Sequence, residues 1–261
     1  MSLDRDPKLN KLLKSWQTGT VKTAETLQKM NYSYQLLDKY KRSNWLRSLG
    51  KGAYAIADQE IHWQGALYPL QNELDLQIRV GGLTALEMLG YGHYIKTNRQ
   101  EIQLFGLEKK KLPLWFRKFM EKENLTITPA TFLNNAESIP VTKKDFGNLP
   151  IIISAPETAY LEMLSTVPGK TSFEEALEVS ENLTTLRSGI LQNLLTSSTS
   201  IKVNRIALYI AEYHQHDWFK KLHVEEITLG KGKRVVQEKG RLDSKYNITV
   251  PDTNREFFQY E

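Results

Sequence analysis

The first 56 residues contain three short amphipathic patterns of helical spacing, and a glycine turn follows the third. This order strongly limits the folds with which the chain can begin. The first pattern, over residues 8–16, has apolar residues at helical spacing and lysines on the opposite side. A second helix capped by Thr20 or Thr23 and a third capped by Ser33, over about 34–43, follow it. The second helix, the tight turn and the third helix together have the length of a helix-turn-helix.

The segment after the third helix predicts a hairpin. Residues 45–49 and 53–56 are typical of two short strands around Gly50-Lys51-Gly52, and a hairpin in this position is a wing. In a winged helix-turn-helix the outer face of the third helix enters the major groove, while the wing meets the phosphate backbone. Gln and Arg on that face suit base edges. The residues predicted to contact DNA are Tyr34, Gln35, Lys39 and Arg42 on the third helix, and Arg47 and Lys51 on the wing.

The basic residues concentrate in this N-terminal part. Residues 1–56 hold eleven Lys and Arg against four Asp and Glu, a net of +7, whereas the whole chain carries +5 and the other 205 residues therefore −2. A basic module on a near-neutral body is typical of nucleic-acid binding. The alternative is a small packed module for protein contacts, with lysines that serve only solubility.

The remaining sequence predicts a mixture of helices and strands. Pro69 should kink or split a helix over residues 58–76. Further along, the patterns indicate strands at 93–95 and 102–105, a solvated loop at 109–111, a loop-rich stretch over 129–150, helices from 151 onward including one over 203–222, and strands at 227–229, 233–236 and 246–250. We therefore predict an α+β fold: a winged helix-turn-helix at 1–78, a larger mixed α/β domain at 79–251 and a tail at 252–261.

A second group of cations lies near the C-terminus of the chain. Its members are Lys202 and Arg205 at the start of the predicted helix 203–222, Lys220 and Lys221 at its end, and Lys231, Lys233 and Arg234 on the following hairpin. Lysines at a helix C-terminus complement the helix dipole, which needs no partner. That explanation does not extend to the three cations on the turn, so we expect a second anionic contact, either with DNA flanking the operator or with an RNA.

Signatures of catalysis, cofactor binding and metal binding are missing from the sequence. It has no Cys, no H-E-x-x-H, no G-x-S-x-G and no Walker A pattern. His214 and His216 alternate on the predicted helix, so their side chains should diverge rather than converge on one ion. We therefore expect neither an enzyme nor a cofactor or metal. Without a signal peptide or a membrane-spanning run, the sequence predicts a soluble cytoplasmic protein.

Several segments, taken in order across roughly residues 10–251, resemble the AbiEi family of bacterial type IV antitoxins. They are Leu49-Gly50-Lys51-Gly52-Ala53-Tyr54, Gly81-Gly82-Leu83-Thr84-Ala85-Leu86 with Gly90 and His93-Tyr94, Trp218-Phe219-Lys220-Lys221-Leu222, Leu229-Gly230-x-Gly232-Lys233-Arg234, and Leu242-Asp243-x-Lys245-Tyr246-x-Ile248-Thr249-Val250-Pro251. No single segment is decisive, and the specificity comes from their order and spacing.

The resemblance implies an N-terminal winged helix-turn-helix, a larger C-terminal antitoxin domain and two activities. One is repression of its own operon through operator DNA. The other is neutralisation of a partner toxin of the AbiEii nucleotidyltransferase family, without a stable complex, in systems linked to abortive phage infection and plasmid maintenance. The paired carboxylates of such a toxin are missing here, since the only Asp-x-Asp is Asp4-Asp6, which fits an antitoxin.

Two other functions stay open on the sequence. The chain could be a winged-helix transcriptional regulator whose C-terminal domain senses a ligand or a partner, with no toxin involved. It could also be an enzyme with an unrecognised site. A toxin-like gene directly downstream, or rescue of growth during toxin expression, would distinguish the antitoxin from both.

Overall fold

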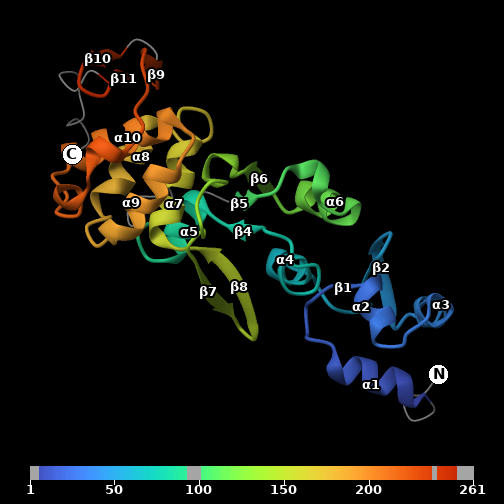
Figure 1. Cartoon of the computed structure of the whole chain (residues 1–261). Helices are drawn as coiled ribbons and strands as arrows, with labels where there is room; N and C mark the ends of the chain where they lie inside the picture. The colour runs from blue at the N-terminus through green and yellow to red at the C-terminus, as the bar shows by residue number, and fades with distance from the viewer. Residues whose placement is uncertain (1–5, 93–100, 237–239, 252–261) are drawn as a thin grey trace, which may run out of the picture. The chain divides into compact units, whose positions relative to one another are not determined.

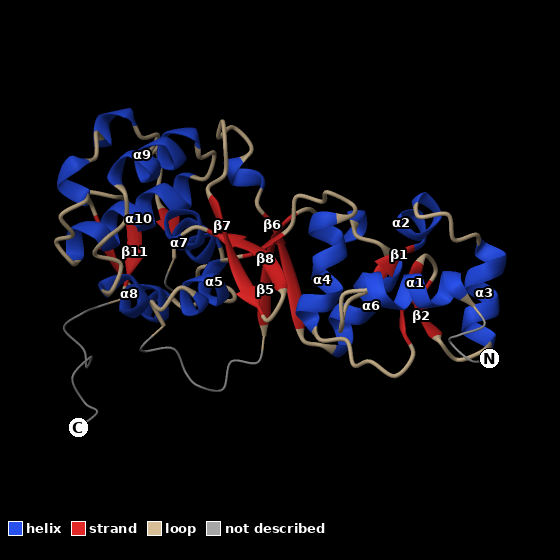
Figure 2. Cartoon of the chain, turned by 90° about the horizontal axis from the view of Figure 1, so that it is seen from below, coloured by secondary structure: helices blue, strands red, loops and turns tan. Residues whose placement is uncertain are grey.

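The computed structural model describes residues 6–92, 101–236 and 240–251. The chain forms two compact units: unit 1 contains residues 1–79, 106–129 and 143–152, and unit 2 contains residues 80–105, 130–142 and 153–261. Both units combine helices and strands, so the predicted α+β class is confirmed (Figures 1 and 2). The strand predicted at 93–95 and the tail at 252–261 lie outside the described residues.

Unit 1 begins with three helices and a small sheet. The helices are α1 (Pro7–Ser15), α2 (Ala24–Lys29) and α3 (Tyr34–Arg42), and the strands are β1 (Lys22–Thr23), β2 (Leu46–Gly50) and β3 (Ala53–Ile56). The strands pair antiparallel in the order β1-β3-β2, so the predicted hairpin is present. The elements share a buried apolar core of Leu9, Leu12, Trp16, Leu27, Tyr32, Leu37, Tyr40 and Leu46.

Helix α4 (Trp63–Asn72) is shorter than the predicted helix 58–76 and contains Pro69 without a break. A proline in this position cannot donate to the carbonyl of Gly65, one turn earlier. That carbonyl instead accepts the N–H of Val21 at 3.1 Å, so it stays satisfied. Residue 65 must be glycine, because a Cβ there would lie 1.8 Å from the carbonyl oxygen of Gly19. The proline is tolerated because a neighbouring segment takes over the lost hydrogen bond.

A five-stranded sheet follows in the middle of the sequence. Its strands, in spatial order, are β6 (Leu125–Pro129), β5 (Ile102–Gly106), β4 (Arg79–Val80), β8 (Leu149–Ser154) and β7 (Val141–Phe146). Strand β4 runs parallel to β8, with Val80 opposite Ile153. Strands β7 and β8 correct the prediction of a loop-rich stretch over 129–150. Between β5 and β6 lie the 3-10 turn η2 (Lys109–Lys111) and helix α6 (Leu114–Lys122).

Unit 2 is mostly helical. Helix α7 (Pro156–Ser165) packs against four other helices, and eight of its ten residues are buried. These neighbours are α5 (Gly82–Met88), α8 (Phe173–Glu181), α9 (Ser188–Ser197) and α10 (Ile201–Tyr213). A three-stranded sheet of β10 (Arg241–Asp243), β11 (Ile248–Val250) and β9 (Arg234–Val235), in this order, completes the described part of the unit (Figure 1).

The C-terminal part of unit 2 corrects two predictions. The helix predicted over 203–222 ends at Tyr213, because Gln215 adopts a left-handed backbone (φ 54°) and Trp218 turns into the core, where its Nε1 donates to the Leu183 carbonyl at 2.7 Å. Residues 227–229 form no strand, and β9 pairs in parallel with β11 instead of closing a hairpin. Within residues 6–92, 101–236 and 240–251, every helix is too short or too polar to cross a bilayer.

Candidate nucleic-acid interface

Helix α3 presents on one face the four of its side chains that the sequence predicts to contact DNA. The Ser33 hydroxyl accepts the N–H of Leu36 at 3.3 Å and caps the helix. This start fixes the helix so that Leu37 and Tyr40 are buried. The exposed side chains are Tyr34, Gln35, Lys39 and Arg42. The exposed face of α3 therefore offers an aromatic ring, an amide and two cations.

Asp6 connects the start of α1 to α3. Its Oδ1 accepts both the N–H of Leu9, at 3.1 Å, and the phenol of Tyr40, at 3.2 Å. Burial raises the pKa of Tyr40, and the charge of Asp6 raises it further, so the phenol stays protonated and donates. The Lys39 ammonium lies 3.9 Å from Asp6 Oδ2. One carboxylate thus fixes α3 against α1 and also attracts an exposed cation of the interface.

Asp38 holds the cations at the end of α3. Its carboxylate lies 3.3 Å from the Lys41 ammonium and 2.6 Å from the Arg42 guanidinium. The hydrogen bond from Lys41 and the charge of Arg42 lower the pKa of Asp38. The Arg42 side chain is 82% exposed, and solvent screens an exposed ion pair of this kind, so the pair contributes little to stability. Arg42 can therefore exchange Asp38 for a base edge or a phosphate at little cost.

The turn between β2 and β3 exposes Lys51. The flanking Gly50 and Gly52 have φ angles of +145° and +82°, which favour glycine. At Gly50 an added Cβ would also lie 2.9 Å from the Cβ of Trp115 on α6. The hairpin turn is therefore held against α6, with the ammonium of Lys51 facing solvent.

Arg47 lies at the start of the hairpin and is half-buried. Its guanidinium donates through Nη2 to the carbonyl of Gln59 at 2.8 Å. This bond ties β2 to the segment before α4. Arg47, which the sequence predicts to contact DNA, therefore has a structural role as well.

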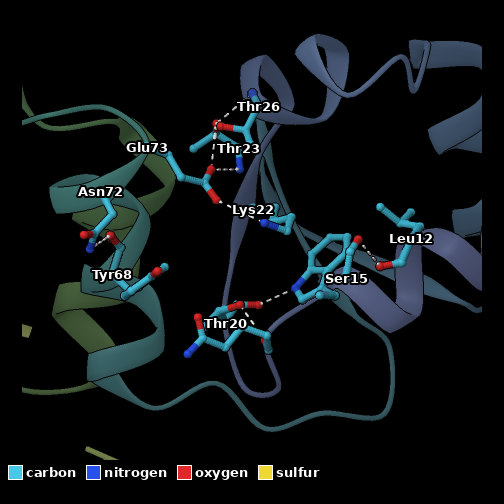
Figure 3. A network of polar contacts seen from close by, with 11 residues as sticks. Leu12, Ser15, Thr20, Lys22, Thr23, Thr26, Tyr68, Asn72 and Glu73 are labelled. Carbon is cyan, nitrogen blue, oxygen red and sulfur yellow. Dashed lines mark hydrogen bonds and ion pairs between the residues drawn. The ribbon is translucent and has the colours of Figure 1, made fainter. Parts of the chain in front are cut away.

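A carboxylate directly after the end of α4 braces the start of α2 (Figure 3). Glu73 accepts the N–H of Thr23 at 3.1 Å and its hydroxyl at 3.2 Å, and lies 3.5 Å from the ammonium of Lys22. Thr23 in turn caps α2. The next residue, Ala24, donates its N–H to the carbonyl of Gly52 in the hairpin turn at 2.9 Å. The helix before α3 is thus tied to both α4 and the hairpin.

Asp6 and Glu73 position the elements of the candidate interface, and neither was identified from the sequence. For Asp6 a signal exists: an Asp directly before Pro7 is the usual combination of N-cap and first helical residue. For Glu73 no local pattern distinguishes a bracing carboxylate from a solvated one, because its partners lie about fifty residues earlier in the chain.

The second group of predicted cations is only partly exposed. Lys231 and Lys233 on the loop that leads into β9, and Arg234 at the first position of β9, are exposed, as predicted. Lys220 and Lys221 are also exposed, but they belong to the turn η4 (Phe219–Lys221) and not to the end of α10. The Lys220 ammonium pairs with Asp217 at 2.7 Å. The dipole of α10 therefore does not explain either lysine.

Arg205 is buried, which corrects its assignment to an exposed basic patch. Only 2% of the residue is exposed. Its guanidinium donates to four backbone carbonyls: Leu229 at 2.7 Å, Gly230 at 3.0 Å, Gly232 at 2.6 Å and Asn247 at 3.1 Å. Burial lowers the pKa of Arg205, and the nearby charge of Arg234 acts in the same direction. Arg205 therefore fixes the loop that carries the three exposed cations.

Lys202 is half-buried and does not belong to the predicted exposed patch. Its ammonium donates to the carbonyl of Ser165, at 3.0 Å, and to that of Val167. Burial lowers the pKa of Lys202. These carbonyls belong to the last residue of α7 and to the segment directly after it, so Lys202 joins α10 to the end of α7.

The rings of His214 and His216 lie 5.5 Å apart, which corrects the expectation that they diverge along a helix. The helix ends before them, so helical spacing does not apply. Nε2 of His214 is 2.9 Å from the Leu177 carbonyl, and Nε2 of His216 is 2.8 Å from the Ser180 carbonyl. Within the described parts of the chain, no cluster of three or more His, Asp or Glu could hold a metal ion.

Two family models together match the chain from residue 5 to residue 251. One describes the N-terminal domain of AbiEi antitoxin transcriptional regulators and matches residues 5–97. The other describes AbiEi antitoxin transcriptional regulators of type IV toxin-antitoxin systems and matches residues 99–251. A search of curated proteins finds no match.

Among solved structures, the chain is similar to the crystal structure of the RV2827C protein from Mycobacterium tuberculosis. The two sequences are 14% identical, and the match covers 92% of this chain and 88% of that one, with a TM-score of 0.59. At this identity the likeness shows a shared fold.

Proposed function

Because this chain belongs to the AbiEi family of type IV antitoxin transcriptional regulators, we propose that it represses its own operon and counteracts a nucleotidyltransferase toxin. In this proposal α2, α3 and the β2–β3 hairpin act as a winged helix-turn-helix on operator DNA. Both activities would take place in the cytoplasm, where the operator and the toxin are found.

The observation that carries the DNA-binding role is the exposed face of α3. Gln35 and Arg42 can each form paired hydrogen bonds with base edges. Lys39 and Lys51 are exposed to solvent, so their ammonium groups can reach phosphates. The inner face of α3 is fixed by Tyr40 and Asp6, so the outer face needs little reordering on binding. Rigid elements of this kind favour specific readout, because less conformational entropy is lost.

Substitutions on α3 and on the hairpin are expected to affect binding in different ways. Gln35→Ala and Arg42→Ala should each cost about 1–3 kcal/mol on the operator and relax sequence preference. Lys51→Ala should weaken binding on all sequences alike and lower the log–log salt slope by about 0.9. Mobility-shift titrations at several salt concentrations measure both effects.

Lys29→Ala is the matched control for these titrations. Lys29 is an exposed lysine on α2 that pairs with Glu25 at 2.8 Å, one helical turn away. Its removal should leave operator binding unchanged. Wild-type affinity and salt slope for the Gln35, Lys39 and Arg42 variants would remove α3 from the interface.

The toxin-directed activity is tested by growth rescue. Co-expression with the toxin encoded beside it should restore growth, and affinity purification of either protein should not retain the other, since we propose that no stable complex forms. Operator binding by the wild-type protein without any rescue of growth would instead favour a ligand-sensing regulator that has no toxin partner.

The loop before β9 supports a second contact with nucleic acid, either DNA beside the operator or an RNA. Reversing Lys231, Lys233 and Arg234 to Glu should leave the melting temperature unchanged, because all three side chains are exposed. The same change should weaken operator binding, abolish rescue from the toxin, or do both. A triple variant that melts, represses and rescues like the wild type would contradict this contact.

A further inference from the structure

Helix α6 is fixed to the hairpin that carries Lys51. Trp115 in its first turn is 3% exposed, and its Cβ would touch any side chain at Gly50. The next residue, Phe116, is fully buried. Contacts join α6 to β2 within unit 1, and Figure 2 shows the two elements beside each other. The exposed face of α6 therefore has a fixed position relative to the hairpin turn.

Two lysines on this face have no carboxylate partner within the described residues. Lys118 and Lys122 are one helical turn apart and exposed. The lysines of the preceding turn η2 differ, because Lys109 lies 3.4 Å from Glu121 and Lys110 lies 2.7 Å from Glu108. Of the lysines on η2 and α6, Lys118 and Lys122 are thus the ones without a carboxylate partner in the described part of the chain, since Lys111 also lies 3.9 Å from Glu108.

A groove of about 390 Å³ runs between β2 and α6. Arg47 and Ser48 of β2 line one wall, and Trp115, Lys118 and Lys122 of α6 line the other. Two carboxylates, Glu60 and Glu123, also line it and are exposed like the two lysines, so Arg47, Lys118 and Lys122 leave the lining with one net positive charge. The groove starts beside the hairpin turn and offers cations along its length, which suits an extended chain of phosphates.

We propose that Lys118 and Lys122 bind the phosphate backbone of the operator duplex beyond the contact made by Lys51. The proposal rests on the proposed DNA-binding function and enlarges its surface: the hairpin and α6 form one continuous phosphate-binding edge. This edge carries no base-reading group, so it adds affinity without sequence preference. Its partner is double-stranded DNA, because the edge extends the hairpin that lies next to α3.

The test is the double variant Lys118→Ala/Lys122→Ala in salt-dependent titrations of the full chain. Loss of two phosphate contacts should lower the log–log salt slope by about 1.8, which corresponds to about 30-fold weaker binding at 0.15 M salt. The loss should be equal on operator and on unrelated DNA. Hydroxyl-radical footprints should shorten at the end of the operator that the hairpin protects.

Lys109→Ala/Lys110→Ala is the matched control, since it removes the same charge from cations already paired with Glu121 and Glu108. It should change the slope by clearly less than the Lys118/Lys122 variant. All these side chains are exposed, so the melting temperature should stay constant and verify folding.

The outcomes separate this proposal from the proposed function. An unchanged slope for Lys118→Ala/Lys122→Ala, with weakened binding for the Gln35 and Lys51 variants, overturns the role of α6 and leaves the winged helix-turn-helix intact. Unchanged binding for every variant overturns both. Loss of toxin rescue without any loss of DNA binding assigns α6 to another partner and likewise overturns the proposal.

Discussion

Arg205→Ala is expected to lower the free energy of unfolding of unit 2 by about 4 kcal/mol, with a fall in melting temperature of about 10 °C. The buried guanidinium donates to four backbone carbonyls, and alanine would remove this donor from all of them. The Asn247 carbonyl would keep the N–H of Arg234, at 3.0 Å, as its donor. An unsatisfied buried polar group costs about 1–3 kcal/mol, and entry of water into the vacated space would recover part of the sum. Chemical denaturation followed by circular dichroism measures the loss.

Two further variants control this prediction. Arg205→Lys keeps the charge but loses the planar fork that spans four acceptors, so an intermediate loss is expected. Arg234→Ala removes an exposed arginine at the start of β9, directly after this loop, and its side chain donates to the adjacent Lys233 carbonyl. It should change stability by less than about 0.5 kcal/mol. Equal stability of the Arg205→Ala and Arg234→Ala variants would contradict a stabilising role for the four hydrogen bonds of the Arg205 guanidinium.

Arg187→Ala is expected to cost about 3 kcal/mol at pH 7, because it leaves a buried carboxylate without its countercharge. Glu157 is 2% exposed and accepts Nε and Nη2 of Arg187, each at 2.9 Å. Burial alone would raise the pKa of Glu157, but the hydrogen bonds from Arg187, helped by backbone donors, outweigh it and lower the pKa. The pair therefore stabilises the folded state above the usual carboxyl pKa, and this contribution is lost as the pH falls.

The pH dependence of the Arg187→Ala variant should have the opposite sign. Without Arg187, burial favours the protonated form of Glu157, so the deficit relative to wild type should shrink between about pH 7 and pH 4. The double variant Glu157→Gln/Arg187→Ala removes the charge and should lose less at pH 7 than Arg187→Ala alone. Denaturation midpoints of wild type and variants at both pH values measure these losses of stability. A loss for Arg187→Ala that does not change with pH would contradict the charged, unpaired Glu157 as its cause.

The sequence predicted the N-terminal helices and the hairpin closely, because their signals are local. Ser33 caps α3 as expected, and the glycines around Lys51 form the turn. Strand β7 was missed because only alternate residues of Val141–Phe146 are half-buried and the strand includes two lysines and an aspartate, so its apolar signal is weak. Local patterns identify elements whose apolar faces are well marked and miss strands whose partners supply most of the burial.

Whether a basic residue is exposed also could not be predicted from local sequence patterns. Arg205 and Arg234 look alike in sequence, yet one is buried and the other exposed. The difference depends on carbonyls contributed by residues 24 to 42 positions later, which no local pattern reports. Similarly, Lys118 was not singled out by sequence, because its position beside the hairpin depends on the contact between Trp115 and Gly50.

The order in which the chain builds its two compact units affects how the protein can mature during synthesis. Unit 1 is complete only when residues 143–152 have emerged from the ribosome, after two segments of unit 2 have already been made. Until residue 115 emerges, the hairpin lacks the tryptophan that backs Gly50. A nascent chain therefore cannot finish unit 1 early, because more than half of the polypeptide must be translated before the last segment of this unit is available.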